Sequence, residues 1–323
     1  MNNILLMDTS ISSLNKGDSI IMECIEQEMK FFTDGKFVLK LPTHISPFHS
    51  YQIWRGSNRI KVYQNCTNKF VCGSNLLVLN MLTHFPQWNI NIFNYKAIKG
   101  SILIGVGAGS GDKTNFYTKY LYKKLLNNEF YHSVRDERTK RFLEDKLGLK
   151  AINTGCPTMW MLTPDFCKEI PVSKADDVVF TLTAHPNKDK RDQLLIDILN
   201  KKYDNIYFWY QGVDDLEYLN KFNNIENIKI INPTVEAYRD LLKRDNLDYI
   251  GTRLHAGVYA MRNKKRAIII AIDERAREIN MCNNLNCIEK ENIDELNNII
   301  DRDIITDIKM PFDKIEIWKK QFM

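Results

Sequence analysis

Short apolar runs alternate with longer amphipathic segments along the first half of the chain. Residues 4–7, 37–41 and 101–106 are apolar stretches of strand length, whereas residues 19–32 carry apolar side chains at helical spacing. This alternation indicates an α/β fold. In the same way we predict strands at 70–79, 130–134 and 150–153, and helices at 117–126 and 137–146.

The alternation is interrupted at residues 163–177, TPDFCKEIPVSKADD, where two prolines and little periodicity are typical of a crossing between domains. It then restarts, which indicates a second α/β domain. We therefore predict an amino-terminal domain over 1–165, a carboxy-terminal domain over 176–307 and a last segment over 308–323, which is helical at 312–322. Within the second domain we predict strands at 178–182, 206–210, 228–231, 249–251 and 267–272, and helices at 191–200, 216–222, 235–244, 256–261 and 293–301.

Composition supports a globular protein of two domains, since 323 residues exceed what one core usually organises. Hydrophobic residues make up 44% and charged residues 26% of the chain, which excludes a disordered protein. The net charge of +5 comes from 45 basic and 40 acidic residues, which we interpret as scattered along the chain. Without a clustered basic stripe, we expect no nucleic-acid partner.

The amino terminus, MNNILLMDTS, has no cationic segment before its short apolar run, so we interpret it as a first strand and not as a signal peptide. No apolar run approaches the roughly 20 residues needed to cross a bilayer. We therefore expect a cytoplasmic protein, with membrane contact at most peripheral and at the inner face. Seven irregularly spaced cysteines predict reduced thiols, with neither a disulfide framework nor a zinc site.

Two glycine-bearing segments follow predicted strands of the first domain. In the first, NKGD, Asp18 or Ser19 serves as a helix N-cap, or Asn15 and Asp18 bind a polar ligand at the end of the strand. The second, GVGAGSG, begins at Gly105. It has serine at position 110, where a dinucleotide loop of the GxGxxG type needs glycine, so we expect no dinucleotide cofactor. Its glycines either bring Gly107 close to a ligand or allow tight packing.

Two further segments place arginine at the end of a predicted strand. In HSVRDER, Arg135 belongs either to a ligand site or to a surface cluster of ion pairs. In GTRLHA, Arg253 and His255 flank Leu254 immediately before a helix, and Arg275 adds positive charge after the next strand. A guanidinium binds carboxylate or phosphate, and an imidazole titrates near neutral pH. We therefore expect a site for a small anion with a group that moves protons.

These segments, in this order, resemble the polysaccharide pyruvyltransferase family, and the resemblance covers most of the chain. SVRD and RLHA are its most specific pieces. Members of that family look like GT-B glycosyltransferases, so the resemblance implies two Rossmann-like domains that face each other across a cleft. It also implies that the helix in 308–323 crosses back and packs on the amino-terminal domain. The matched segments are NKGD, VCGSNLL, GVGAG, SVRDERTKRFLEDKLG, GCPTMW, and GTRLHAGVYAM followed by AIDER.

The resemblance implies transfer of pyruvate from phosphoenolpyruvate to a sugar of a surface polysaccharide, such as a capsule or exopolysaccharide, or of its lipid-linked precursor. The product is a pyruvate ketal, and phosphate is released. Phosphoenolpyruvate is then a co-substrate, and we expect no cofactor and no metal. The alternatives are a nucleotide-sugar glycosyltransferase of GT-B fold and a non-catalytic glycan-binding relative. The sequence leaves the acceptor and the oligomeric state open.

The same resemblance assigns roles to individual residues. We expect the carboxy-terminal domain to bind phosphoenolpyruvate and the amino-terminal domain to bind the acceptor. The predicted catalytic residues are His255, Arg253 and Arg135; the predicted donor-binding residues are Arg135, Arg253, Leu254, His255 and Arg275; the predicted acceptor-binding residues are Asn15, Asp18 and Gly107.

Overall fold

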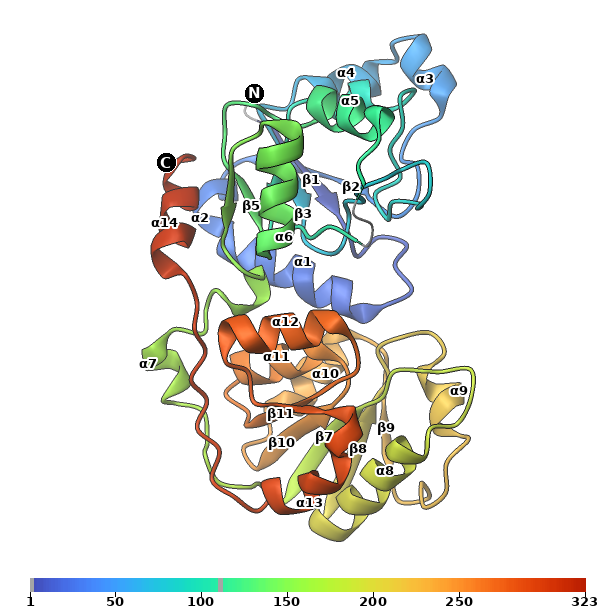
Figure 1. Ribbon diagram of the computed structural model, residues 1–323, viewed down its shortest axis with the longest axis vertical. Helices are drawn as coiled ribbons and strands as arrows, with labels where there is room; N and C mark the ends of the chain where they lie inside the picture. Colours follow the sequence, from blue (N-terminus) through green and yellow to red (C-terminus); the bar gives the residue numbers. More distant parts are fainter. Residues whose placement is uncertain (1–2, 110–112) are drawn as a thin grey trace. The chain divides into compact units, whose positions relative to one another are not determined.

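The computed structural model of the protein describes residues 3–109 and 113–323, with Glu274 and Arg275 described in their backbone only. The chain forms two compact units. The first comprises Met1–Ser13, Ile21–Trp160 and Pro311–Met323, and the second comprises Leu14–Ile20 and Met161–Met310. Each unit has a parallel β-sheet with helices packed against it (Figure 1). The α/β fold class is therefore confirmed.

The first unit has a four-stranded parallel sheet in the order β2-β1-β3-β4. Strand β1 pairs with β2 on one side and with β3 on the other. Its residues 4–7 are at most 1% exposed, as expected for a central strand of a parallel sheet that is buried on both faces. The strands of this unit are β1 (Asn3–Asp8), β2 (Phe37–Pro42), β3 (Asn68–Cys72) and β4 (Ser101–Ile104), with β5 (His132–Val134) and β6 (Ala151–Asn153) in a second, two-stranded sheet.

Strand β3 is shorter than predicted and ends at Cys72, because the next two residues turn the chain. Gly73 has φ +62° and Ser74 has φ +59°, in the left-handed region that a strand cannot contain. Two short helices after β2 were not predicted, α3 and α4. The helices of the first unit are α1 (Lys16–Glu28, continuing into this unit from the second), α2 (Lys30–Thr33), α3 (Ser50–Trp54), α4 (Asn58–Gln64), α5 (Phe116–Leu125), α6 (Glu137–Arg141) and α14 (Phe312–Lys320), with short 3₁₀ or π segments η1 (Tyr95–Ile98), η2 (Phe142–Leu147) and η3 (Pro157–Met159).

The last helix, α14, belongs to the first unit although it follows the second in sequence. Trp318 is fully buried, and its Nε1 donates to the carbonyl of Tyr131 (2.9 Å). Its ring lies 5.0 Å from that of Phe322, which in turn packs edge-on against Phe70 at 5.1 Å. The expectation that the carboxy-terminal helix crosses back to the amino-terminal domain is confirmed. Its main apolar side is covered by protein.

The second unit has a six-stranded parallel sheet in the order β12-β11-β10-β7-β8-β9. Successive residues of its strands face opposite sides: Phe208 joins the core formed with α8, η4 and α13, whereas Trp209 stacks on Tyr238 of α10 at 4.1 Å. The strands are β7 (Asp177–Thr181), β8 (Asn205–Trp209), β9 (Lys229–Ile231), β10 (Leu247–Gly251), β11 (Ala267–Ala271) and β12 (Cys287–Glu289), and the helices are α7 (Pro164–Cys167), α8 (Lys190–Lys202), α9 (Asp215–Leu219), α10 (Val235–Leu242), α11 (Leu254–Arg262), α12 (Glu274–Asn283), η4 (Lys290–Glu295) and α13 (Leu296–Ile299).

A short segment near the amino terminus, Leu14–Ile20, belongs to the second unit, which the sequence did not predict. Helix α1 begins there, at Lys16. Its N-cap is Asn15, whose Oδ1 accepts from the N–H of Gly17 (2.9 Å), and not Asp18 or Ser19. The helix starts two residues before Asp18, so that Asp18 lies in its first turn.

Candidate active site

Arg253 lies at the carboxyl end of β10, and the carboxylate of Asp215 holds its guanidinium. Nε donates to Asp215 Oδ2 (3.1 Å) and to the carbonyl of Leu182 (3.2 Å), and Nη2 donates to Asp215 Oδ1. In this bidentate pair the planar fork of arginine meets both carboxylate oxygens. Asp215 is fully buried, whereas the Arg253 side chain keeps 15% of its surface exposed. The pair therefore fixes a cation at the sheet edge where open α/β folds bind ligands.

Asp215 is also held by the backbone of two neighbouring loops. The N–H groups of Gln211 (3.2 Å) and Gly212 (2.7 Å) donate to Oδ2, and the N–H of Ala184 (3.1 Å) donates to Oδ1. A Cβ at Gly212 would lie only 2.5 Å from Nη2 of Arg253. Glycine at this position therefore allows the loop to approach the arginine closely. One buried carboxylate thus connects the loops after β7 and β8 to Arg253.

The loop after β8 is joined to the amino-terminal NKGD segment within the second unit. Lys16 donates its N–H to the carbonyl of Gln211 (2.8 Å), and Gln211 Nε2 donates to Asn15 Oδ1 (2.7 Å). Asn15 and Gly212 also form an antiparallel bridge. Gln211 is 4% exposed, and its Oε1 is buried without a hydrogen-bond donor among the residues that the structure describes. Most buried polar side-chain atoms in proteins do have a hydrogen-bond partner.

His255 lies two residues after Arg253, in the first turn of α11, and is 6% exposed. Gly251 allows β10 to lie close to β7 at this point, since a Cβ there would lie 2.7 Å from the backbone N and O of Thr181 in that neighbouring strand. Arg253 itself is extended, with φ −93° and ψ 98°, immediately before the helix. The GTRLH sequence therefore places a guanidinium, a helix amino terminus and an imidazole at one strand end, an arrangement suited to anions.

The first unit has its own arginine at a strand end. Arg135 follows β5 and is 8% exposed. Its Nη2 donates to Asn75 Oδ1, and its Nε lies 3.7 Å from a carboxylate oxygen of Asp136. A Cβ at Gly107 would lie 2.5 Å from Arg135 Nε and 2.6 Å from Asn75 Oδ1, so the glycine turn after β4 makes room for the guanidinium. The turns after β3, β4 and β5 thus meet around Arg135.

His132, which immediately precedes the matched SVRD segment, has a structural role. It is fully buried, its Nδ1 accepts from the N–H of Leu103 (3.2 Å), and its Nε2 faces the carbonyl of Asn127 (2.8 Å). These partners place the proton on Nε2. Burial lowers the pKa of His132 from 6.5 to about 4, so the ring is neutral near pH 7.

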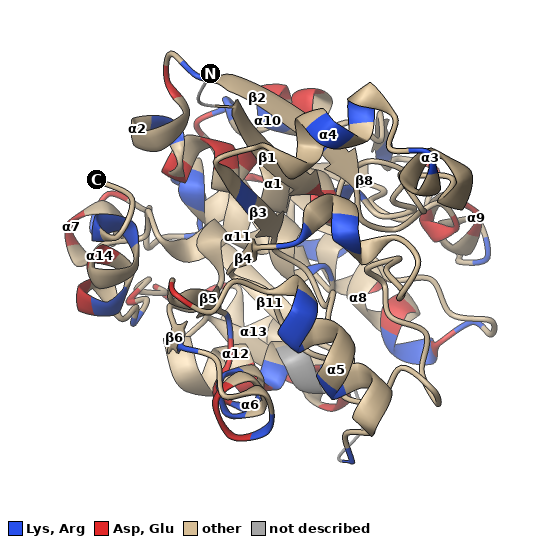
Figure 2. Cartoon of the chain, turned by 90° about the horizontal axis from the view of Figure 1, so that it is seen from above, with Lys and Arg blue, Asp and Glu red and all other residues tan. Residues whose placement is uncertain are grey.

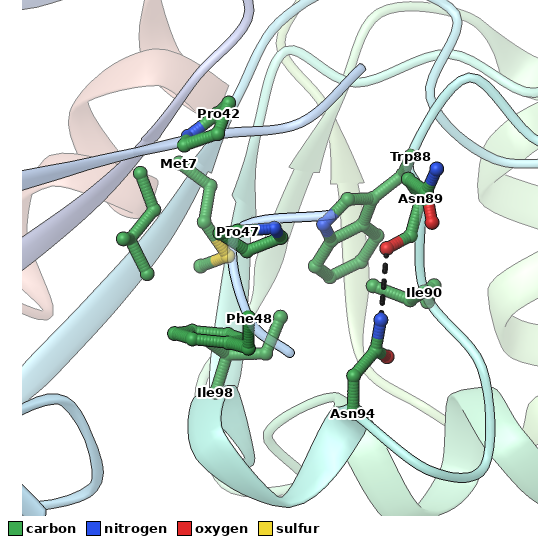
Figure 3. A pocket seen from close by; sticks show the side chains of 10 residues that line it. Met7, Pro42, Pro47, Phe48, Trp88, Asn89, Ile90, Asn94 and Ile98 are labelled. Atoms are coloured by element: carbon green, nitrogen blue, oxygen red, sulfur yellow. Dashed lines mark hydrogen bonds between the residues drawn. The ribbon is translucent and has the colours of Figure 1, made fainter. Parts of the chain in front are cut away.

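A pocket in the first unit is largely apolar and lies beside the ends of β1 and β2, where Met7, Leu41 and Pro42 line it (Figure 3). None of the described residues that line it is charged, and its amide side chains are those of Asn89 and Asn94, the latter donating to the carbonyl of Asn89 (3.1 Å). A pocket of this kind offers nothing to a carboxylate or a phosphate. Its other lining residues are Met7, Leu41, Pro42, Pro47, Phe48, Trp88, Ile90 and Ile98.

The predicted site residues fall into two groups, one in each unit. The side chain of Arg275 lies outside the described residues, although its backbone begins α12. Sequence reasoning missed Asp215, Gln211 and Asn75, which hold the predicted residues in place. The first unit contains Arg135 and Gly107, and the second contains Asn15, Asp18, Arg253, Leu254 and His255.

Comparison with known proteins places this geometry in a family. A family model described as polysaccharide pyruvyl transferase matches residues 15–274. The chain belongs to this family. The match begins at Asn15, and it contains both arginine sites and His255, so the resemblance that the motifs indicated is confirmed. The enzyme class is that of the pyruvyltransferases, acting on polysaccharide. No curated protein was found to match the chain.

Solved structures give the fold of this pyruvyl transferase family member. The UDP-GlcNAc 2-epimerase of Methanocaldococcus jannaschii, in complex with UDP-GlcNAc and UDP, is similar with a TM-score of 0.50 and 12% identity, covering 99% of each chain. That similarity supports a GT-B-like pair of Rossmann-like units. S. aureus MnaA with UDP (12% identity, 98% of this chain and 95% of that chain, TM-score 0.49) and the Neisseria meningitidis UDP-GlcNAc 2-epimerase bound to UDP-GlcNAc (13%, 99% and 100%, 0.47) are also similar.

Proposed function

We propose that this enzyme transfers the pyruvyl group of phosphoenolpyruvate to two hydroxyls of one sugar in a surface polysaccharide or its lipid-linked precursor. The observation that carries the proposal is the Arg253–Asp215 pair at the end of β10, with His255 two residues further in the first turn of α11. It supplies a fixed cation and a proton-transfer group together. The family supplies the pyruvyl transfer and the class of acceptor.

Ketal formation sets two chemical requirements. One sugar hydroxyl adds to C2 of the enolpyruvyl group while C3 takes a proton and becomes a methyl group. The C2–O bond to phosphate then breaks, leaving an oxocarbenium-like centre, and the second hydroxyl adds to that centre. Each of the two sugar hydroxyls loses one proton. One of these protons accounts for the proton gained at C3, and the other leaves with the phosphate. The site therefore needs cations for the donor and a group that carries protons between oxygen and carbon.

The second unit suits the donor. Asp215 engages the Nε and Nη2 side of Arg253, and no protein acceptor for Nη1 is found among the residues that the structure describes. We assign that nitrogen, together with the amino terminus of α11 at Leu254, to the carboxylate or phosphate of the donor. His255 is assigned the proton transfers. Arg275, at the start of α12, is proposed as a further donor-binding cation.

The acceptor residues that the family resemblance implies belong to both units, Asn15 and Asp18 to the second and Gly107 to the first. Asn15, Asp18 and the glycine turn at Gly107 are proposed to contact the sugar, and Arg135 is proposed as the second catalytic cation.

The proposal is tested by incubating the enzyme with phosphoenolpyruvate and a panel of synthetic or lipid-linked glycosides. We expect phosphate release that depends on the acceptor, and a product heavier than the acceptor by pyruvate minus water. Parallel reactions receive nucleotide sugars in place of phosphoenolpyruvate. Hexose transfer from these, without pyruvylation, would replace the proposal by a glycosyltransferase. Glycan binding without turnover of any donor would indicate a non-catalytic relative.

A further inference from the structure

Charge is distributed unevenly along the chain, contrary to the even scatter that its composition suggested. Between residues 35 and 128 there are 12 basic residues and a single acidic one, Asp112, which gives this stretch a net charge of +11. The rest of the chain has 33 basic and 39 acidic residues, a net charge of −6. The small overall charge of +5 therefore conceals a strongly basic segment within the first unit.

The same stretch exposes large apolar side chains. Phe85 is fully exposed, Phe116 is 82% exposed and Trp54 is 78% exposed, and Leu82 and Phe93 follow at 72% and 60%. Side chains of this size usually lie inside the protein or at an interface. Apolar and cationic groups also alternate closely: the Arg55 guanidinium lies 4.6 Å from the ring of Tyr51, and Lys124 lies over the ring of Tyr120.

Neighbouring elements of the first unit carry these residues. Helices α4 and α5 both pack against η1, Thr118 of α5 accepts from the N–H of Met81 (2.9 Å), and Tyr117 accepts from that of Ile92 (3.3 Å). Figure 1 shows α3, α4 and α5 at the same end of the unit, and Figure 2 shows basic segments but no acidic ones on α4 and α5. We call this surface, made of α3, α4, η1, α5 and the loop 81–93, the basic apolar face.

We propose that the basic apolar face docks on an anionic phospholipid membrane. Cations attract the phosphate-rich surface, while aromatic and aliphatic side chains enter the interface between headgroups and acyl chains. Exposed cations lie on each part of the face that can meet the lipid: Arg55 after α3, Arg59 and Lys61 on α4, Lys96 on η1, and Lys123 and Lys124 on α5. Leu82, Ile92 and Val62 are exposed among them, and branched aliphatic side chains favour a lipid surface over stacking with nucleic-acid bases.

This face is distinct from α14, the other basic and aromatic segment of the unit. In α14 the residues Ile315 and Trp318 are 3% and 0% exposed, so that their apolar surface is already covered. No helix among the described residues has the length and apolar character to cross a bilayer. The proposal is independent of the donor and of the ketal chemistry.

The first test measures binding to vesicles by sedimentation. We expect the whole protein to bind vesicles of phosphatidylcholine with 30 mol% phosphatidylglycerol at least tenfold more tightly than pure phosphatidylcholine vesicles. Raising the salt from ~0.1 M to ~1 M should weaken that binding several-fold, since the Debye length falls from about 10 Å to about 3 Å. Equal binding to both vesicle types, or none to either, would overturn the proposal.

Trp54 provides a site-specific readout, because the other four tryptophans are at most 4% exposed. We expect its emission to shift to the blue on vesicle binding and to be quenched by brominated phosphatidylglycerol. Trp54→Phe should keep the binding and lose the quenching. Binding without quenching of Trp54 would show that another surface meets the lipid.

Matched variants locate the surface. The apolar variant Trp54→Ser/Phe85→Ser/Phe116→Ser and the charge variant Arg59→Glu/Lys61→Glu/Lys123→Glu should each weaken vesicle binding at least tenfold. These side chains are exposed, so unchanged circular dichroism and thermal unfolding should accompany the loss. The controls are exposed residues of the second unit, Met281→Ser/Ile305→Ser and Lys168→Glu/Lys243→Glu, which should bind like the wild type.

Nucleic acid is the competing partner for a basic aromatic surface. The same variants are therefore titrated with labelled single-stranded and double-stranded oligonucleotides. Tight binding of an oligonucleotide that the charge variant abolishes, with no binding to anionic vesicles, would replace the membrane by nucleic acid.

Discussion

Replacing Asp215 by asparagine tests whether its carboxylate holds Arg253 and the neighbouring loops in place. Each carboxylate oxygen accepts from at least two donors: Oδ1 from the N–H of Ala184 and from Arg253 Nη2, and Oδ2 from Arg253 Nε and two backbone amides. Asparagine keeps the shape of the side chain, but its NH₂ group, which cannot accept these hydrogen bonds, must replace one of the two oxygens and face the donors that oxygen had. At least two hydrogen bonds are then lost, one of them to a charged group.

Loss of a neutral hydrogen bond costs about 1 kcal/mol and loss of one to a charged partner about 1.5–3 kcal/mol. We therefore expect Asp215→Asn to lower the free energy of unfolding by about 3 kcal/mol. For a unit of this size, this corresponds to a fall in Tm of about 6–12 °C. Calorimetry measures this effect, and hydrogen exchange at the amides of Gln211 and Gly212 shows whether it is local. The affinity for phosphoenolpyruvate should fall as well, because Arg253 loses its fixed orientation.

The neighbouring aspartate provides the control. Asp214 is exposed, and its side chain makes no capping hydrogen bond to α9, so Asp214→Asn should change stability by less than about 0.5 kcal/mol. If Asp215→Asn were as mild as this, the carboxylate would not be holding Arg253 and its loops, and the reasoning from the hydrogen bonds would be wrong.

Other predictions concern catalysis, the last helix and acid stability. His255→Gln should reduce turnover ~10²-fold or more while donor affinity stays within a few-fold, and wild-type turnover would remove His255 from the mechanism. Arg253→Lys should instead raise the KM for phosphoenolpyruvate first, because a single ammonium cannot both pair with the two oxygens of Asp215 and present a further nitrogen to the donor; an unchanged KM would contradict this. Trp318→Ala should lower the free energy of unfolding, measured with denaturant, by about 3–5 kcal/mol and should increase proteolysis near residue 310. Ile317 is exposed, so Ile317→Ala should have neither effect. His132, whose pKa is lowered to about 4 by burial, should contribute stability in full above pH 6.5 and lose about 3 kcal/mol as the pH falls to 4. His132→Gln should flatten this part of the stability curve, and unaltered pH dependence would refute it.

The sheets were predictable from the sequence where strands are buried on both faces. Strands β7 and β8 appear in the sequence as continuous apolar runs, and each ends within one residue of its predicted limit. Strand β12 was missed because its three residues are only half-buried at the sheet edge. Helix α12 was missed because its sequence, ERAREINMCN, is mostly polar and has no clear apolar stripe.

Of the candidate site, the sequence could predict the arginines that directly follow the ends of strands. GTRLH and SVRD follow apolar strands directly, which is why Arg253 and Arg135 could be placed at sheet edges. Asp215 could not be selected, since the sequence VDDLEY has two adjacent aspartates and does not show which one is buried. Likewise, nothing local in NKGD indicates that Asn15 pairs with Gln211, 196 positions away in the chain.

The segment Leu14–Ile20 belongs to the second unit, so that unit is not encoded by one continuous stretch of the gene. A fragment starting at Met161 would lack both the bridge from Asn15 to Gly212 and the hydrogen bond from Gln211 to Asn15. If relatives exchanged their second units from residue 161 onward, the NKGD segment of one protein would have to pair with the turn after β8 of another. Substitutions in the NKGD segment and in the turn after β8 must therefore stay compatible with each other, although the two stretches lie far apart in the gene.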